Sequence, residues 1–208
     1  MSDDDSRFTS GVSNRLRIIS VMDYLSETTT LDALTVADVC AAADISRASF
    51  YRLFEDKYDA VNWYITLVHR LGHAETGRTL SWRDASITSL SGYRLMGNLM
   101  TAAVTSQGYD SPNELSIRLR RSDLLASLAE RLSAEIDDRL RFQVEFFCQA
   151  EIPLVNDWFV HGADVSVDEM ALRVESCVPP QLHELLNKPQ HPQRPVGHLS
   201  LGRLFALH

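Results

Sequence analysis

The chain has 208 residues, of which 45% are hydrophobic and 23% are charged, a balance typical of one or two globular domains with packed cores. Its net charge of −8 argues against broad, non-specific binding of polyanions, although it leaves room for one small basic face. No apolar run approaches the roughly 18 to 20 residues that a membrane span requires.

The N-terminal segment MSDDDSRF is acidic, whereas a secretory signal peptide starts with basic residues and continues with an apolar run. We therefore expect a cytoplasmic protein. The three cysteines, Cys40, Cys148 and Cys177, are scattered and odd in number. This pattern indicates neither a disulfide framework nor a zinc cluster.

Signals for strands are sparse, whereas signals for helix N-termini are plentiful. In a capping box, a Ser or Thr side chain binds the backbone N–H three residues later, and the acidic or amide side chain there binds back. This pattern occurs in TVAD from Thr35, SWRD from Ser81, SPNE from Ser111 and SVDE from Ser166. Asp56 is a further candidate cap. The sequence therefore predicts an all-α fold.

The first helix is expected from about residue 13 to residue 27, where apolar residues recur at helical spacing. A second, short helix follows the Thr35 cap. Asp44, a residue type that tolerates the left-handed conformation of a tight turn, comes next, and Ser46 can cap a third helix. A fourth helix is expected from about Lys57 to Leu71. Two short helices joined by a tight turn and braced on each side form a helix-turn-helix.

The third helix is predicted to bury Phe50, Leu53 and Phe54 and to expose its other side. A helix that enters the major groove needs small residues for close approach and donors that reach bases or phosphates. Lys57, in the first turn of the next helix, lies where backbone N–H groups favour a phosphate. The predicted DNA-binding residues are Thr35, Ser46, Arg47, Ala48, Ser49, Tyr51, Arg52 and Lys57. An ordinary amphipathic helix with a solvated polar face is the alternative interpretation.

The run LTVADVCAAADISRASFYRLFEDKYDAV resembles the DNA-binding domain of the TetR family of bacterial transcription regulators. The resemblance rests on a Thr-capped second helix, the turn ADIS, Tyr51 with Phe54, and Lys57 at the start of the fourth helix, and it extends from roughly Arg15 to Leu71. It implies a homodimeric regulator of a pseudo-palindromic double-stranded DNA operator. Such a protein would be a repressor by default or an activator, and a small ligand or a partner protein would modulate it.

Two features depart from this pattern. Asp44 stands where the family usually has a turn glycine, and it adds negative charge near the predicted DNA face. Residues 1–71 contain seven Arg or Lys against eleven Asp or Glu. Because DNA affinity depends on phosphate neutralisation, we expect modest, salt-sensitive binding. The charge deficit also supports an alternative function, a regulator-like protein that binds a partner or senses an effector with little DNA affinity.

The resemblance implies a three-helix helix-turn-helix domain in residues 1–75, a larger helical dimerisation and effector-binding domain in residues 76–187, and a Pro-rich, flexible tail in residues 188–208. The segment WFVHGADVSVDEMALRV resembles the last two helices of the branch that includes the dihydroxyacetone kinase activator. An isologous interface there would set two recognition helices ~34–36 Å apart. The candidate dimer-interface residues are Trp158, Phe159, Met170 and Val174. Burial in the core of one subunit is the alternative.

Candidate effector-pocket residues lie at helical spacing in two segments. They are Tyr93, Met96 and Met100 in the first segment, and Phe142, Phe146 and Gln149 in the second. Such a stripe more often forms plain core than a ligand cavity. Pro153 is expected to kink its helix or to start a new one.

His69 and His73 have the i, i+4 spacing that can hold a metal ion on a helix, but the sequence offers no third ligand. We also find no Ser/His/Asp order, nucleophile elbow or glycine-rich phosphate loop. The sequence therefore predicts no metal, no cofactor and no catalytic residue.

Overall fold

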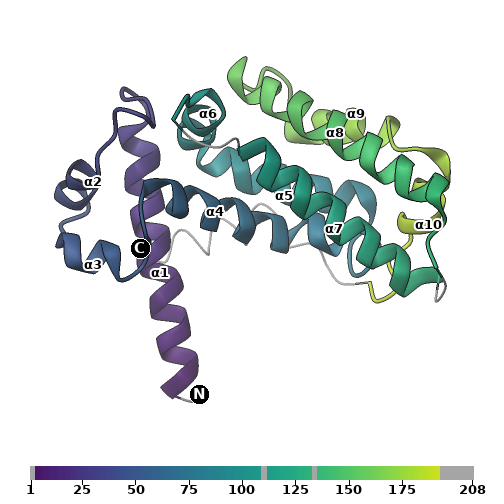
Figure 1. Ribbon diagram of the computed structural model, residues 1–208, viewed down its shortest axis with the longest axis horizontal. Coiled ribbons are helices and arrows are strands. Elements are labelled where there is room, and N and C mark those ends of the chain that lie inside the picture. Colours follow the sequence, from purple (N-terminus) through teal and green to yellow (C-terminus); the bar gives the residue numbers. More distant parts are fainter. Residues whose placement is uncertain (1–2, 109–111, 133–134, 193–208) are drawn as a thin grey trace.

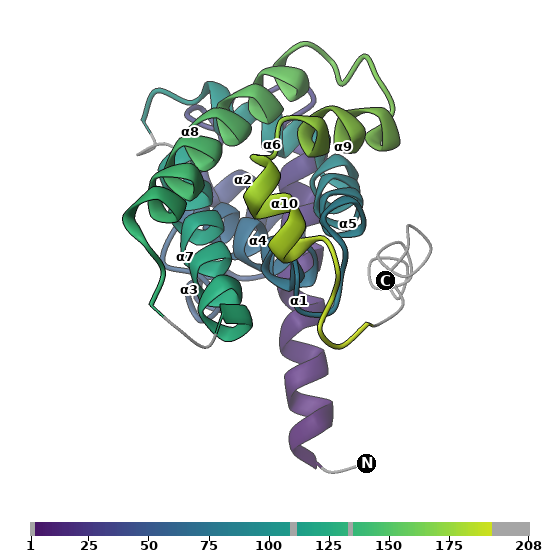
Figure 2. The ribbon, with the colours of Figure 1, turned by 90° about the vertical axis from the view of Figure 1, so that its right-hand side faces the viewer.

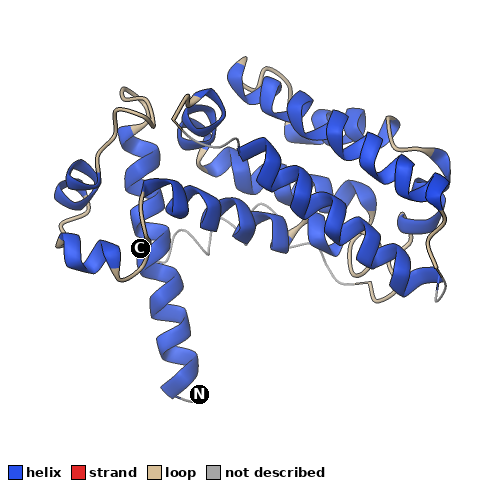
Figure 3. Cartoon of the chain, viewed as in Figure 1, coloured by secondary structure: helices blue, strands red, loops and turns tan. Residues whose placement is uncertain are grey.

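The computed structural model describes residues 3–108, 112–132 and 135–192, and its regular elements are helices (Figures 1 and 3). Within those residues the only β-type pairing is an isolated bridge between Thr76 and Leu80. The predicted all-α fold is therefore confirmed. None of the described helices combines the length and the apolar composition that a membrane span needs.

Helix α4 runs from a small N-terminal group of helices into a larger bundle (Figure 1). The elements are α1 (Asp3–Leu25), α2 (Val36–Ala42), α3 (Arg47–Tyr51), α4 (Lys57–Leu71), the short 3-10 helix η1 (His73–Glu75), α5 (Trp82–Leu95), α6 (Gly97–Thr105), α7 (Pro112–Leu132), α8 (Asp138–Val160), α9 (Val167–Ser176) and α10 (Pro180–Leu186). Viewed from the far end of the bundle, α10 lies in front, between α7 and α8 on one side and α5 and α9 on the other (Figure 2).

The predicted caps start the helices where the structure describes them. Thr35 Oγ1 accepts from the N–H of Asp38, whose carboxylate accepts in return from the N–H of Thr35. Ser81 caps α5 and Ser166 caps α9, each by accepting a hydrogen bond from the backbone N–H three residues later. Asp56 caps α4. Ser111 lies outside the described residues.

The first helix is longer than expected, because it begins at Asp3 rather than near residue 13. The expectation rested on the apolar stripe, which marks the part of a helix that packs on a core and not its full length.

The turn between α2 and α3 is built around Asp44, whose φ of 49° lies in the left-handed region. The N–H of Asp44 donates to the carbonyl of Ala41, and the N–H of Ile45 donates to that of Cys40. These two hydrogen bonds form a Schellman motif, which normally takes glycine at the left-handed position. Asp44 adopts the conformation expected of it, and Ser46 then caps α3 by accepting from the N–H of Ser49 at 3.1 Å.

Three apolar clusters form the interior. The first joins α1, α2, α3 and α4 with α6, which contributes Leu99 and Met100. The second joins α5, α7, α8 and α10 around Trp82, and the third joins α5, α8 and α9 around Trp158. Helix α6 therefore packs into the core of the helix-turn-helix region although it follows that region in the sequence. The domain boundary at residues 75 and 76 stays a prediction.

Helix α8 continues through Pro153, so the expected start of a new helix at this proline is wrong. Pro153 is exposed. Proline has no N–H, so it cannot donate to the backbone carbonyl of Gln149, four residues earlier. This carbonyl therefore lies on the solvent side, where water can satisfy it.

Candidate functional site

The inner face of α3 is fixed to α1 and α4. Phe50 is fully buried and Phe54, in the turn that follows α3, is 3% exposed, as predicted. Leu53, which was also expected to be buried, is only partly buried. The ring of Phe54 lies 5.8 Å from that of Phe50 and 5.9 Å from that of Trp63. The guanidinium of Arg15 lies 5.7 Å from the Phe54 ring and 5.8 Å from the Trp63 ring. This packing leaves α3 little freedom to rotate.

The outer face of α3 carries most of the predicted DNA-binding side chains. Arg47, Ala48, Tyr51 and Arg52 are exposed, and Ser49 is half-buried. The Tyr51 ring stands edge-on to the Phe50 ring at 5.6 Å, so it projects from a rigid base. This short helix therefore presents two guanidinium groups and a phenol beside a small alanine.

Two predicted DNA-binding residues have partners inside the chain. The Thr35 hydroxyl donates to the Asp38 carboxylate at 2.5 Å. Lys57 Nζ donates to the carbonyls of Asp32 and Leu34, each at 2.8 Å, and so uses two of its three N–H donors. Lys57 therefore anchors the segment that leads into α2, a role that the sequence analysis missed.

Both charge signs lie around α3. Asp44, Glu55 and Asp56 are exposed on either side of the helix, as the acidic composition predicts. Arg17, which the sequence analysis did not select, is also exposed and donates to the carbonyl of Ala43 at the end of α2. Its position on α1, distant in sequence from α2, gave no signal of this contact.

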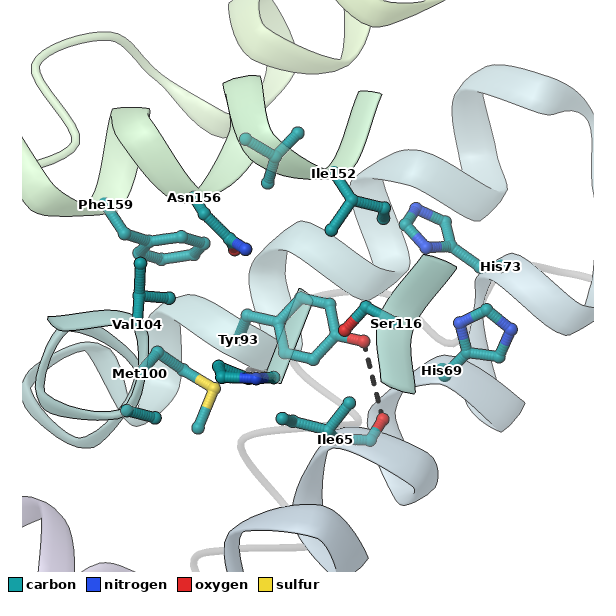
Figure 4. Close-up of a pocket in the computed structure, with 13 residues that line it drawn as sticks. Ile65, His69, His73, Tyr93, Met100, Val104, Ser116, Ile152, Asn156 and Phe159 are labelled. Carbon is teal, nitrogen blue, oxygen red and sulfur yellow. Dashed lines mark hydrogen bonds between the residues drawn. The ribbon is translucent and has the colours of Figure 1, made fainter. Parts of the chain in front are cut away.

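An interior cavity lies among α4, α5, α6, α7 and α8 (Figure 4). About 40 Å³ of it is open to the centres of water molecules. Its main apolar lining residues are Ile65, Met100, Val104, Ile152, Val155 and Phe159. Its polar lining residues are His69, His73, Tyr93, Ser116 and Asn156.

Only part of the predicted effector set lines this cavity. Tyr93 and Met100 do, and Met96 is buried in the adjoining core cluster. Phe142, Phe146 and Gln149 do not. Phe142 is 69% exposed and Phe146 is 66% exposed, because the opposite face of α8 packs on the core. The stripe at 142, 146 and 149 is an outer surface, which corrects the prediction.

The predicted dimer residues also divide into two pairs. Trp158 is 3% exposed and Phe159 is 6% exposed, and both pack in the third core cluster. They are core residues of one subunit, which corrects their assignment to an interface. Met170 and Val174 instead line a surface groove between α8 and α9.

A buried ionic network lies next to the cavity. Arg120 Nε donates to Glu151 at 2.9 Å, and both side chains are almost completely buried. The same guanidinium donates to the carbonyl of His73 at 3.2 Å and to Thr76 Oγ1 at 3.0 Å. His69 Nε2 lies 2.8 Å from a carboxylate oxygen of Asp123. The sequence analysis selected the two histidines for their spacing but could not identify these partners.

Carboxylates from the helix-turn-helix region hold both ends of α6. Asp23 accepts from the N–H of Leu99 at 2.9 Å, at a helix start that has no side-chain cap of its own. Asp32 accepts from the Ser106 hydroxyl and from the N–H groups of Gln107 at 2.8 Å and Gly108 at 3.1 Å. The hydrogen bond from Ser106, followed by that from Gln107, lowers the pKa of Asp32. Helix α6 thus joins the cavity wall to the helix-turn-helix region.

No protein-family model matches the chain, and no curated protein matches it in sequence. Among solved structures the chain is similar to the dihydroxyacetone kinase operon activator DhaS, with a TM-score of 0.61 and 12% identity over 83% of this chain and 98% of that chain. Another similar structure is the TetR family repressor AlkX from Dietzia sp. strain DQ12-45-1b, with a TM-score of 0.49 and 17% identity over 82% and 98% of the two chains. The similarity to DhaS confirms the fold that the sequence resemblance implied.

Proposed function

We propose that this chain is a TetR-like transcription regulator that binds a pseudo-palindromic DNA operator as a homodimer. The observation that carries the proposal is α3 with the turn that follows it. Buried Phe50 and Phe54 hold this segment in place, while Arg47, Tyr51 and Arg52 face solvent. The fold shared with an operon activator supports it. Regulation is repression by default in this family, with activation as the alternative.

The chemistry of the α3 surface suits the major groove. Arginine forks can bind guanine or phosphate through two hydrogen bonds. Ala48 allows the helix backbone to approach the bases, and Tyr51 and Ser49 add hydroxyl groups. The acidic residues on either side of α3 limit non-specific attraction, so we expect operator affinity to fall steeply with salt.

A second copy of the chain would cover the outer face of α8 and α9. Phe142, Phe146 and Leu154 on α8 are each at least 66% exposed, and Leu172 on α9 is 45% exposed. The rings of Phe142 and Phe146 stack at 6.3 Å. Exposed apolar side chains in such number mark an interaction surface. A self-complementary contact there would use this face in both subunits.

A ligand in the interior cavity would act on DNA binding through α6. The wall that Met100 and Val104 form belongs to α6, and Asp23 and Asp32 tie both ends of this helix to the helix-turn-helix region. A ligand that displaces α6 would therefore change the spacing of the two α3 helices in the dimer, and with it the operator affinity.

A gel-shift assay with the DNA upstream of the gene, at low and high salt, tests the proposal. Arg52→Ala should weaken binding by about 1–3 kcal/mol. Arg83→Ala is the matched control, because Arg83 is also an exposed arginine but pairs with Glu175 beside α10, at the opposite end of the molecule from α3 (Figure 1). If folded dimer retards no DNA at low salt, the regulator proposal fails and the partner-binding alternative is favoured.

A further inference from the structure

The interior cavity combines a broad apolar wall, interrupted by Asn156 on α8, with a polar corner at the histidines (Figure 4). The apolar wall consists mainly of Met100 and Val104 from α6 and Ile152 and Phe159 from α8. The polar corner lies on the side of α4, η1 and α7, where His73 and Ser116 reach the cavity. A molecule that fills this space would therefore need an apolar body with a polar group at one end.

His73 is the group that points to a ligand. It is only 4% exposed and lines the cavity, yet its imidazole has no hydrogen-bond partner among the described residues. Its backbone is held on both sides, because its N–H donates to Ser89 Oγ at 2.8 Å and its carbonyl accepts from Arg120. Buried polar side chains normally have partners, so a fixed imidazole without one leaves a position for a bound molecule.

The charged groups beside this corner already have partners, because Arg120 binds Glu151 and the Asp123 carboxylate faces His69 at 2.8 Å. Burial, and then the charges of Arg120 and His69, lower the pKa of His73 well below its usual value. The imidazole is therefore neutral, with one N–H donor and one acceptor nitrogen. Arg120 already donates to Glu151, to the carbonyl of His73 and to Thr76. A charged ligand would lose its hydration without gaining an ion pair, so the site favours a neutral one.

The size of the cavity limits the ligand further. The 40 Å³ open to water centres corresponds to a few water molecules, since one needs about 10–15 Å³ on this measure. Even a molecule with a single ring must therefore push the walls apart. Helix α6 is the shortest of the α-helices around the cavity, which makes it the wall most easily displaced as a unit.

We propose that this cavity binds a compact, neutral, amphipathic molecule whose hydroxyl or carbonyl group hydrogen-bonds to His73. Its apolar ring or short chain lies against α6 and α8. The proposal rests on the proposed function in one respect, namely that this molecule is the effector of the regulator.

Phenol and toluene form a matched pair of probes, because they share size and shape and differ in the hydroxyl group. The chain is labelled with ¹³C at its methionine methyl groups and titrated by NMR, and the signal of Met100 reports on binding. His73→Phe should weaken phenol binding about 3- to 10-fold, the effect of one net hydrogen bond, and should leave toluene binding unchanged. Val104→Phe, which fills the cavity, should abolish the response to both probes.

The proposal is overturned if His73→Phe changes both affinities equally, if neither probe shifts the Met100 signal of the wild type, or if Val104→Phe leaves binding intact. His73→Leu is the second variant should His73→Phe not fold, and it should also weaken phenol binding selectively. A gel shift on the same preparations separates the two proposals. Selective phenol binding without DNA binding supports the proposed ligand class and refutes the regulator function. DNA binding without selective phenol binding supports the regulator function and refutes the proposed ligand class.

Discussion

At the residue scale, several charged side chains bind groups inside the chain instead of facing solvent. Lys57 donates to two carbonyls of the segment before α2, although lysine in this position suggested a phosphate contact. Arg120 and Glu151 form a pair whose side chains are 0% and 1% exposed. In both cases the charged group binds other groups of the same chain and not a partner molecule. Each case leads to a measurable prediction.

Lys57→Met keeps the aliphatic stem of the side chain and removes the ammonium. We expect a loss of about 1–2 kcal/mol of unfolding free energy, because two charge-assisted hydrogen bonds disappear. Chemical denaturation measures this loss. The exposed Arg52→Met is the comparison and should lower operator affinity without changing stability. A Lys57→Met protein of full stability and reduced DNA affinity would instead indicate a direct phosphate contact.

Arg120→Met should destabilise the chain by about 3–5 kcal/mol, because it leaves the Glu151 carboxylate buried without a counter-charge. The double variant Arg120→Met, Glu151→Leu should recover much of the loss, since it removes both charges from the interior. Urea unfolding of the two variants provides the measurement. If the double variant is as unstable as the single one, the ion pair itself stabilises the core.

At the element scale, α6 connects the cavity to the helix-turn-helix region. It lines the cavity through Met100 and Val104, and it packs in the same core cluster as α1 and α4. The helix has no side-chain cap of its own and depends on Asp23 from α1. A short helix held from outside in this way can move as a unit when a ligand enters.

Asp32→Asn should loosen the segment that follows α6 and weaken the effect of a cavity ligand on operator affinity. The folded-state pKa of Asp32 lies below its usual 3.8. The carboxylate therefore stabilises the fold at pH values above about 3.8, and this contribution is lost as the pH falls through the lower, folded-state pKa. The difference in thermal midpoint between wild type and variant should be largest near pH 7 and should shrink in acid. A difference that does not depend on pH would exclude this role.

At the scale of the whole molecule, the exposed apolar face of α8 and α9 is the surface on which we propose that a second copy of the chain packs. Phe142, Phe146 and Leu154 are large apolar side chains that are mostly exposed. Phe146 and Leu154 line the groove that also includes Met170 and Val174. Since one short α3 helix offers few base contacts, the proposed operator binding would need the two half-sites that a dimer supplies.

Phe146→Glu should convert a dimer into a monomer and lower operator affinity about 100-fold or more, because the second half-site no longer binds within the same complex. Analytical ultracentrifugation measures the mass, and a gel shift measures the affinity. Tyr24→Glu is the matched control, because this aromatic residue of α1 is 70% exposed and lies away from α8. A dimer that survives Phe146→Glu would place the interface elsewhere.

The sequence alone determined the features that depend on near neighbours in the chain. The capping box at Thr35, the N-cap at Ser166 and the left-handed turn at Asp44 follow from residues a few positions apart, because backbone hydrogen bonding and helix periodicity are local. Only the tertiary structure decided which stripe of a helix turns inward. Phe146 and Trp158 both lie on α8, yet the first is exposed and the second is buried. The Ser106 hydroxyl donates to Asp32, which lies 74 positions away in the sequence. This hydrogen bond depends on how distant helices pack, and local spacing does not encode that packing.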